Sequence, residues 1–212
     1  WLADTDPDNY ARIVPENGDP TARERGERRI LDRVAKMLSV SEAQGGGTLK
    51  TLRGGVDLPG ARRFSLMQAP VSTDLNPEAT RRYAKNRLRV VREVYYSAKK
   101  QDRIDLVLFL NGIPVATIET KSSFTQPLEA AKKQYRQDRR PKGEPLLTPF
   151  RGALVHFGVT EENVVMTTAL AGEDTFFLPF DTGHGNGAGN PPREGQHMTS
   201  YLWEEVLDVD AW

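Results

Sequence analysis

Residues 104–121 read Ile-Asp-Leu-Val-Leu-Phe-Leu-Asn-Gly-Ile-Pro-Val-Ala-Thr-Ile-Glu-Thr-Lys, two apolar runs separated by Asn-Gly. Apolar runs around this dipeptide predict a β-hairpin. Three charged residues interrupt the pattern: Asp105 near the start of the first run, and Glu119 and Lys121 at the end of the second. Charges in such apolar strands are costly unless they are paired, and a divalent cation held by two carboxylates beside a lysine would pair them.

The turn decides whether these three side chains can meet, because side chains alternate between the two faces of a strand. A two-residue turn at 111–112 would send Glu119 to the face opposite Asp105. A three-residue loop at 110–112, with Gly112 left-handed in a bulge, would bring all three polar side chains to one face. We therefore expect that loop, or another bulge, with positive φ at Gly112.

Other segments around the hairpin carry a recognisable pattern. They are residues 83–86, 90–92, 96–97, 153–157, 166–168 and 201–205. Together with the hairpin they resemble, in order, the PD-(D/E)xK nuclease motif, and more narrowly the N-terminal nuclease domain of the restriction (R, HsdR) subunit of type I restriction-modification enzymes. The resemblance covers most of the chain from about residue 50 onward.

The resemblance implies roles for individual residues. Asp105 and Glu119 would bind the metal, and Lys121 would be the catalytic lysine. Gln134 matches a glutamine that the family carries on the helix after the lysine and that belongs to the catalytic set, whereas the tyrosine expected four positions later is absent. Related nucleases also draw an acid from an early helix, but Glu24 and Glu27 match no such pattern.

The same resemblance implies a fold, a cofactor and partners. The fold would be restriction-endonuclease-like α/β, a mixed central β-sheet flanked by helices with an N-terminal embellishment. The cofactor would be Mg²⁺, with Mn²⁺ as a substitute, and the number of ions stays open. Partners would be double-stranded DNA and the modification and specificity subunits. Since the sequence contains no Walker A motif, ATP would be used only by a motor region outside this chain.

Composition narrows the class of protein further. A chain of 212 residues can bury a full core, and the absence of cysteine excludes disulfide frameworks and zinc-thiolate sites. No apolar stretch of about twenty residues is present, so we expect no membrane partner. A soluble, intracellular protein fits these properties, and the resemblance implies the prokaryotic cytoplasm.

Basic residues concentrate around the hairpin although the net charge is zero. Residues 81–142 hold 16 Lys or Arg against 6 Asp or Glu, which leaves 13 against 23 elsewhere. This surplus suits a phosphate-binding channel, although ordinary solvated helix faces would look the same. The residues expected to bind DNA are Arg87, Arg89, Lys132, Lys133, Arg136, Arg139 and Arg140.

Three regions are expected along the chain. Residues 1–76 would form a helical and β embellishment packed on the core, with a helix starting at 19–20 and short strands between 49 and 66. Residues 77–182 would form the nuclease core, and residues 183–212 a Gly-rich loop and a helix, over 199–212, leading toward the missing motor. In the core we expect helices near 77–86 and 126–139, and strands near 87–96, 152–159 and 163–168.

Two functions from different classes follow. The first is a Mg²⁺-dependent endonuclease that cuts DNA without sequence specificity of its own. The second is a catalytically idle DNA-binding or subunit-assembly module whose strand acids pair with arginines. Metal dependence separates the two.

Overall fold

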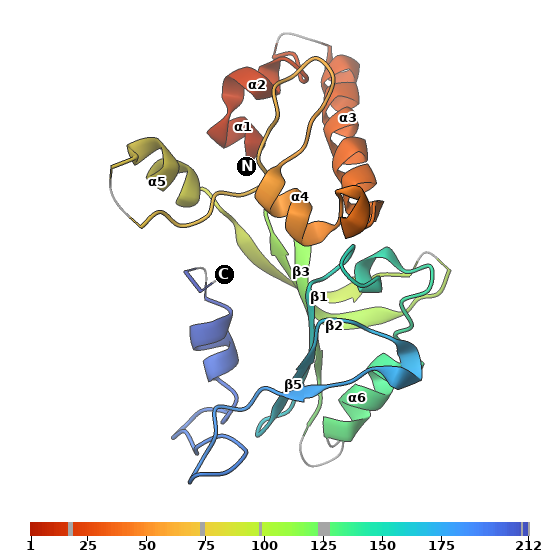
Figure 1. Ribbon diagram of the computed structural model, residues 1–212, viewed down its shortest axis with the longest axis vertical. Helices are drawn as coiled ribbons and strands as arrows, with labels where there is room; N and C mark the ends of the chain where they lie inside the picture. The colour runs from red at the N-terminus through yellow and green to blue at the C-terminus, as the bar shows by residue number, and fades with distance from the viewer. Residues whose placement is uncertain (17–18, 73–74, 98, 123–127, 209, 212) are drawn as a thin grey trace. The chain divides into compact units, whose positions relative to one another are not determined.

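Figure 1 shows the computed structural model, in which the chain divides into two compact units. Unit 1 comprises residues 1–89 and 110–113, and unit 2 comprises residues 90–109 and 114–212. The structure describes every residue except 17–18, 73–74, 98, 123–127, 209 and 212.

A mixed six-stranded β-sheet, in the order β1-β2-β3-β4-β5-β6, confirms the predicted α/β class. Its strands are β1 (Leu88–Tyr95), β2 (Arg103–Leu110), β3 (Ile113–Thr120), β4 (Val155–Val159), β5 (Val164–Thr167) and β6 (Leu178–Pro179). Strands β3 and β4 are parallel, whereas β4 with β5 and β5 with β6 are antiparallel. The interior strands β3 and β4 are buried along almost their whole length, as expected for strands covered on both sides.

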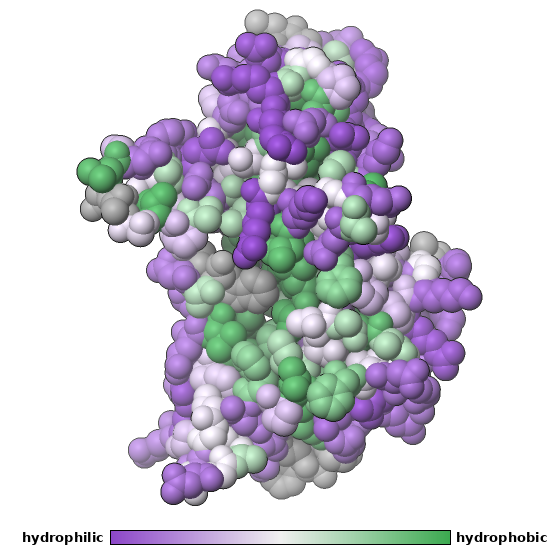
Figure 2. All heavy atoms as spheres, in the orientation of Figure 1, coloured by the Kyte–Doolittle hydropathy of each residue, from purple (hydrophilic) through white to green (hydrophobic). Residues whose placement is uncertain are grey.

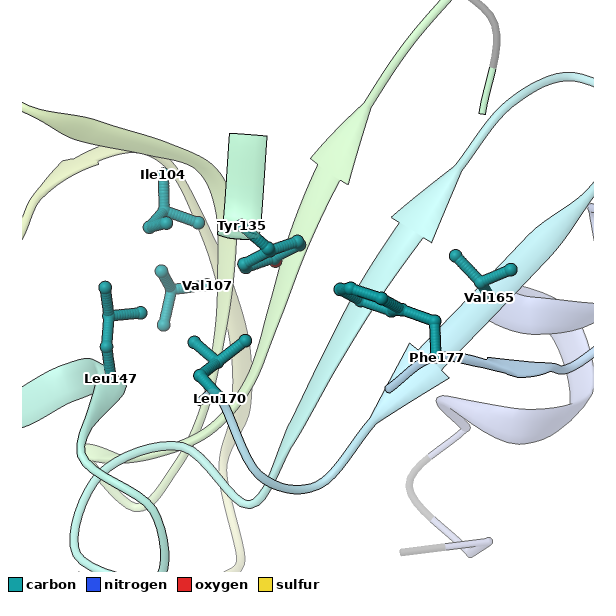
Figure 3. Close-up of a cluster of buried hydrophobic side chains, with 7 residues drawn as sticks. All are labelled: Ile104, Val107, Tyr135, Leu147, Val165, Leu170 and Phe177. Carbon is teal, nitrogen blue, oxygen red and sulfur yellow. The ribbon is translucent and has the colours of Figure 1, made fainter. Parts of the chain in front are cut away.

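Helix α6 (Leu128–Gln137) packs on the sheet of unit 2 over a hydrophobic cluster (Figure 3). Tyr135 of α6 is completely buried there. The cluster consists of Ile104, Val107, Tyr135, Leu147, Val165, Leu170 and Phe177. The helix predicted over 126–139 is therefore present, while its expected start at 126–127 lies outside the described residues.

The hairpin turn, which belongs to unit 1, differs from the expected three-residue loop. Strand β2 ends at Leu110 and β3 begins at Ile113, and both residues between them have positive φ, 51° for Asn111 and 88° for Gly112. Two consecutive positive φ values define a two-residue type I′ turn. The expected loop is therefore wrong, whereas positive φ at Gly112 is confirmed. Asn111 donates side-chain hydrogen bonds to the Leu66 carbonyl and to Asn86 Oδ1, which fixes its conformation.

Strand β2 does not alternate regularly, and an irregularity of this kind is the alternative to the three-residue loop that the sequence predicted. Ile104 and Val107 are three residues apart, yet both are fully buried in the same cluster, on the same side of the strand in Figure 3. A strictly alternating strand would place them on opposite faces. The break resembles that of a β-bulge, which the sequence analysis named as the other way to bring the three polar side chains to one face.

Unit 1 is mainly helical. Its elements are α1 (Leu2–Thr5), α2 (Pro7–Ala11), α3 (Pro20–Ser39), η1 (Glu42–Gln44), α4 (Thr48–Gly54) and α5 (Pro77–Tyr83). Helix α3 begins as predicted, because the Asp19 carboxylate accepts a hydrogen bond from the Ala22 amide at 2.6 Å. Figure 2 shows mostly hydrophilic spheres over α3, in keeping with its many exposed charged residues.

The short strands expected between 49 and 66 are largely wrong. Helix α4 occupies the first part, since Leu49 and Leu52 have the three-residue spacing of one helix face and only Leu52 of the two is fully buried. What remains of the β pairing is one isolated antiparallel bridge between Val56 and Phe64.

The C-terminal part of unit 2 forms less helix than predicted. The short helices are η2 (Pro145–Leu147), η3 (Gly172–Asp174) and the five-residue π-helix η4 (Leu202–Val206). Tyr201 and Leu202, within the helix predicted over 199–212, are buried, and the Tyr201 hydroxyl donates to the Phe180 carbonyl. Across the described residues, no helix combines the length and apolarity needed to cross a bilayer.

Gly112→Ala should destabilise the chain by about 1 kcal/mol, because an L-residue pays that much at positive φ. An added Cβ would meet no atom within 4 Å at this position, so the cost reflects the backbone alone. The measurement is chemical denaturation. Gly54→Ala is the matched control, since its Cβ is equally free and its φ is ordinary; equal losses in both variants would contradict the turn assignment.

Candidate active site

The carboxyl ends of the parallel strands β3 and β4 meet at one edge of the sheet in unit 2. Glu119 lies one residue before the end of β3 and pairs with Gly158 of β4. Lys121 follows the strand, and its amide donates to the Val159 carbonyl at 2.8 Å. Since they are two residues apart, Glu119 and Lys121 project to the same face.

Asp105 reaches this edge from β2. Its Oδ2 accepts two hydrogen bonds from Thr120, one from the amide at 2.8 Å and one from the hydroxyl at 3.0 Å. The described hydrogen bonds leave Oδ1 unused. With 30% of its side chain exposed, Asp105 is the open member of the site.

Glu119 is the buried member, with none of its side chain exposed. Its Oε1 accepts a hydrogen bond from Arg139 Nε at 2.8 Å. Its Oε2 is buried and has no hydrogen-bond partner in the part of the chain that the structure describes. A carboxylate oxygen left in this condition is costly, and such an atom calls for a cation or a proton.

Lys121 stands between the two acids. Its Nζ lies 3.8 Å from Glu119 Oε2 and 4.0 Å from Asp105 Oδ2. These distances exceed those of a good hydrogen bond, so the three groups are close without being locked together. The structure thus brings together the three residues expected from the sequence, despite the two-residue turn.

Burial is the main cause of an unusual pKa at Glu119. Desolvation raises the pKa of this carboxyl to about 7, with a further rise from Asp105, while Arg139 and Lys121 oppose the shift. The attraction of two cations therefore fails to offset the loss of hydration. A carboxyl group whose pKa lies near neutrality is typical of functional sites.

The donor set fits a hard divalent cation. Two carboxylates supply oxygen ligands, and Glu119 Oε2 and Asp105 Oδ1 are both without hydrogen bonds among those described. Within the described parts of the chain, no group of three or more His, Asp or Glu side chains is placed to hold a metal. Any ion here would take its remaining ligands from water, backbone or substrate, as Mg²⁺ commonly does.

A hydrogen-bonded chain lies behind Glu119 on β3. Thr117 Oγ1 is 2.7 Å from His156 Nδ1 and 2.9 Å from the Tyr135 hydroxyl, which donates onward to the Phe157 carbonyl. All three side chains are fully buried. Burial lowers the pKa of His156 to about 3, so its ring is neutral. Sequence reasoning missed this network, because its members share no spacing in the chain.

Two of the predicted site residues, Gln134 and Arg139, do not make the contacts that the sequence analysis expected. Gln134 is partly exposed on α6, and none of the described hydrogen bonds joins its side chain to the acids or to Lys121. Arg139, expected to face DNA, is buried against Glu119, and its guanidinium carbon is 5.7 Å from the Tyr96 ring centre. No local pattern points to the pair of Glu119 and Arg139, because its members lie twenty positions apart in the chain.

The other basic residues divide between exposed and engaged positions. In unit 1, Arg87 pairs with Asp4 at 2.8 Å and Arg89 is exposed. In unit 2, Lys133 and Arg140 are exposed. Lys132 pairs with Glu129 at 2.6 Å, and Arg136 donates to the Thr175 carbonyl and lies over the Phe177 ring. The predicted phosphate-binding channel stays a prediction.

Comparison with protein families gives one match. The model of the type I restriction enzyme R protein N terminus matches residues 48–175, more than half of the chain. The matched region contains strands β1 to β5, α6 and the whole cluster of acids and lysine. Neither a curated protein nor a solved structure matches the chain.

The raised pKa of Glu119 predicts a loss of stability as the pH rises. The folded chain binds this proton more tightly than the unfolded chain, whose carboxyl has an ordinary pKa of 4.5, so folding is favoured less as the pH passes from 4.5 to about 7. Between these limits the free energy of unfolding of the wild type should fall by about 3 kcal/mol relative to that of Glu119→Gln. Denaturation with EDTA present measures this difference, and a constant difference across the range would show that Glu119 is ionised throughout.

Proposed function

Because the chain belongs to the family of N-terminal domains of the type I restriction enzyme R protein, we propose that it is the Mg²⁺-dependent endonuclease domain of such an enzyme. It hydrolyses phosphodiester bonds in double-stranded DNA and has no sequence specificity of its own. The observation that carries this proposal is the buried Glu119 Oε2, which has no hydrogen bond among the described residues and lies 3.8 Å from the Lys121 ammonium.

The side chains of this edge have separable tasks. Asp105 and Glu119 would hold the ion, and Thr120 fixes the orientation of Asp105 through two hydrogen bonds. When bound, Mg²⁺ polarises the scissile phosphate and stabilises the leaving oxygen. Lys121, held near both acids, donates a hydrogen bond to the attacking water or to a phosphate oxygen and so orients the reactants. Gln134 of α6 is a further candidate on the strength of its match to the family alone.

The remaining assignments follow from the family. The exposed Lys133 and Arg140 contact DNA through phosphates, which suits cutting without base recognition. The domain works in a complex with modification and specificity subunits in the prokaryotic cytoplasm. ATP is consumed by a motor region of the R protein, outside this chain.

The ion pair between Arg139 and Glu119 favours a second candidate function. A strand acid satisfied by an arginine is what a catalytically idle DNA-binding or assembly module would contain. In that module Mg²⁺ would neither stabilise the chain nor change its contacts with DNA. Binding of Mn²⁺ distinguishes the two functions.

Glu119→Ala and Lys121→Ala should each lower DNA cleavage by the complete restriction enzyme at least about a hundredfold, since each removes stabilisation realised only in the transition state. ATP hydrolysis and translocation should continue. Glu173→Ala, which removes an exposed acid elsewhere in unit 2, is the control and should cut normally. Mg²⁺ should raise the thermal midpoint of the wild type but not of Glu119→Ala. Cleavage at the wild-type rate by Glu119→Ala would refute the nuclease function and favour the DNA-binding or assembly module.

Lys133→Ala combined with Arg140→Ala should lower the affinity for DNA and make that affinity less dependent on salt. If each contacts one phosphate, the slope of log K against log salt becomes shallower by roughly 2. Fluorescence anisotropy in EDTA measures binding without cleavage. The control pair is Arg25→Ala with Arg151→Ala, two exposed basic residues outside the basic region. An unchanged slope would assign Lys133 and Arg140 to an ordinary solvated surface.

A further inference from the structure

Arg139 is unusual among the basic residues that follow the hairpin. Only 10% of its side chain is exposed, whereas the neighbouring Arg140 is exposed. Its Nε donates to Glu119 Oε1 at 2.8 Å, and its described hydrogen bonds involve no exposed acid. A residue serving only to attract phosphates has no reason to bury its charge in this way.

The contact divides the two oxygens of Glu119 between two cations. Oε1 belongs to Arg139, while Oε2 lies on the side of Lys121, whose Nζ is in turn 4.0 Å from Asp105. Oε2 makes no hydrogen bond with any residue that the structure describes. The carboxylate is therefore anchored by one oxygen and open at the other, toward the remaining members of the site.

Arg139 is itself held from several directions. Its backbone amide donates to the Gln134 carbonyl at 3.0 Å, which ties it to the end of α6. Its guanidinium lies over the Tyr96 ring. A planar group fixed in these ways restricts the orientation of the carboxylate that it binds, which a flexible lysine would do less well.

We propose that Arg139 is a positioning residue of the metal centre, which holds Glu119 so that Oε2 is presented to the divalent cation. This inference rests on the proposed nuclease function and adds a residue to it. Groups that orient metal ligands through hydrogen bonds typically contribute 10–100-fold to metal affinity.

A rival role for the same contact predicts the opposite sign. If Arg139 merely takes the place of the ion, it competes with the metal, and its removal would strengthen metal binding because one positive charge leaves the site. Positioning instead predicts weaker binding without Arg139. The direction of the change decides between the two roles.

The experiment titrates the chain with Mn²⁺ in the absence of DNA and follows free Mn²⁺ by electron paramagnetic resonance. Arg139→Gln should raise the dissociation constant about 10–100-fold. Arg140→Gln, an equal loss of charge one residue away that does not touch Glu119, should leave it unchanged. An unchanged or lower dissociation constant for Arg139→Gln overturns the proposal.

Further variants guard against misfolding and test the geometry. Arg139→Lys keeps the charge beside the buried Glu119 and should also bind Mn²⁺ more weakly, since it lacks the planar group. Added guanidinium ion should restore Mn²⁺ binding to Arg139→Ala, and ethylammonium should not. Full affinity in Arg139→Lys, or equal rescue by both cations, would show that charge alone matters and would overturn positioning.

Two comparisons separate this inference from the proposed function. If Glu119→Gln binds Mn²⁺ as well as the wild type, the metal centre itself is wrong. If Glu119→Gln loses affinity and Arg139→Gln does not, only the role of Arg139 is wrong. DNA affinity of Arg139→Gln in EDTA should equal that of the wild type, because the side chain acts through Glu119; a weaker affinity with a shallower salt slope would make it a DNA contact instead.

Discussion

A single buried carboxylate, that of Glu119, sets the constraint on which the rest of unit 2 depends. Its side chain is fully buried at the end of β3, where desolvation raises its pKa to about 7. Arg139 and Lys121 lie on its two sides and lower the cost of its charge without removing it. A group of this kind persists only where the surrounding structure holds it, and its unsatisfied oxygen is the feature that a metal ion would use.

The packing around β3 explains how the site is held. Parallel pairing with β4 brings the carboxyl ends of two buried strands to one edge. Helix α6 packs on the sheet and supplies Tyr135 to the core. Arg139 follows the helix, and its amide donates to the Gln134 carbonyl of the last turn. The hydrogen-bonded chain through Thr117 gives partners to the Tyr135 hydroxyl and to His156 Nδ1, whereas His156 Nε2 has no partner among the described residues. The hydrophobic core and the site are therefore parts of one arrangement.

Charge along the sequence proved a coarse guide to the surface. Basic residues outnumber acidic ones over residues 81–142, but the individual side chains make different contacts. Arg136 bonds a backbone carbonyl, Arg139 binds a buried acid, and Lys133 and Arg140 remain exposed. A count of charges cannot separate these cases, because it contains no information on burial.

The sequence by itself determined the hairpin, the three charged residues on it and the family, because apolar runs, an Asn-Gly turn and local motifs are written in consecutive positions. It also predicted the start of α3 from Asp19-Pro20. Only the tertiary structure decided how Asp105 meets Glu119 and Lys121, since a two-residue turn combines with an irregular β2. The partnership of Arg139 with Glu119 was likewise decided there. Contacts between residues far apart in the chain depend on packing, which local sequence patterns do not encode.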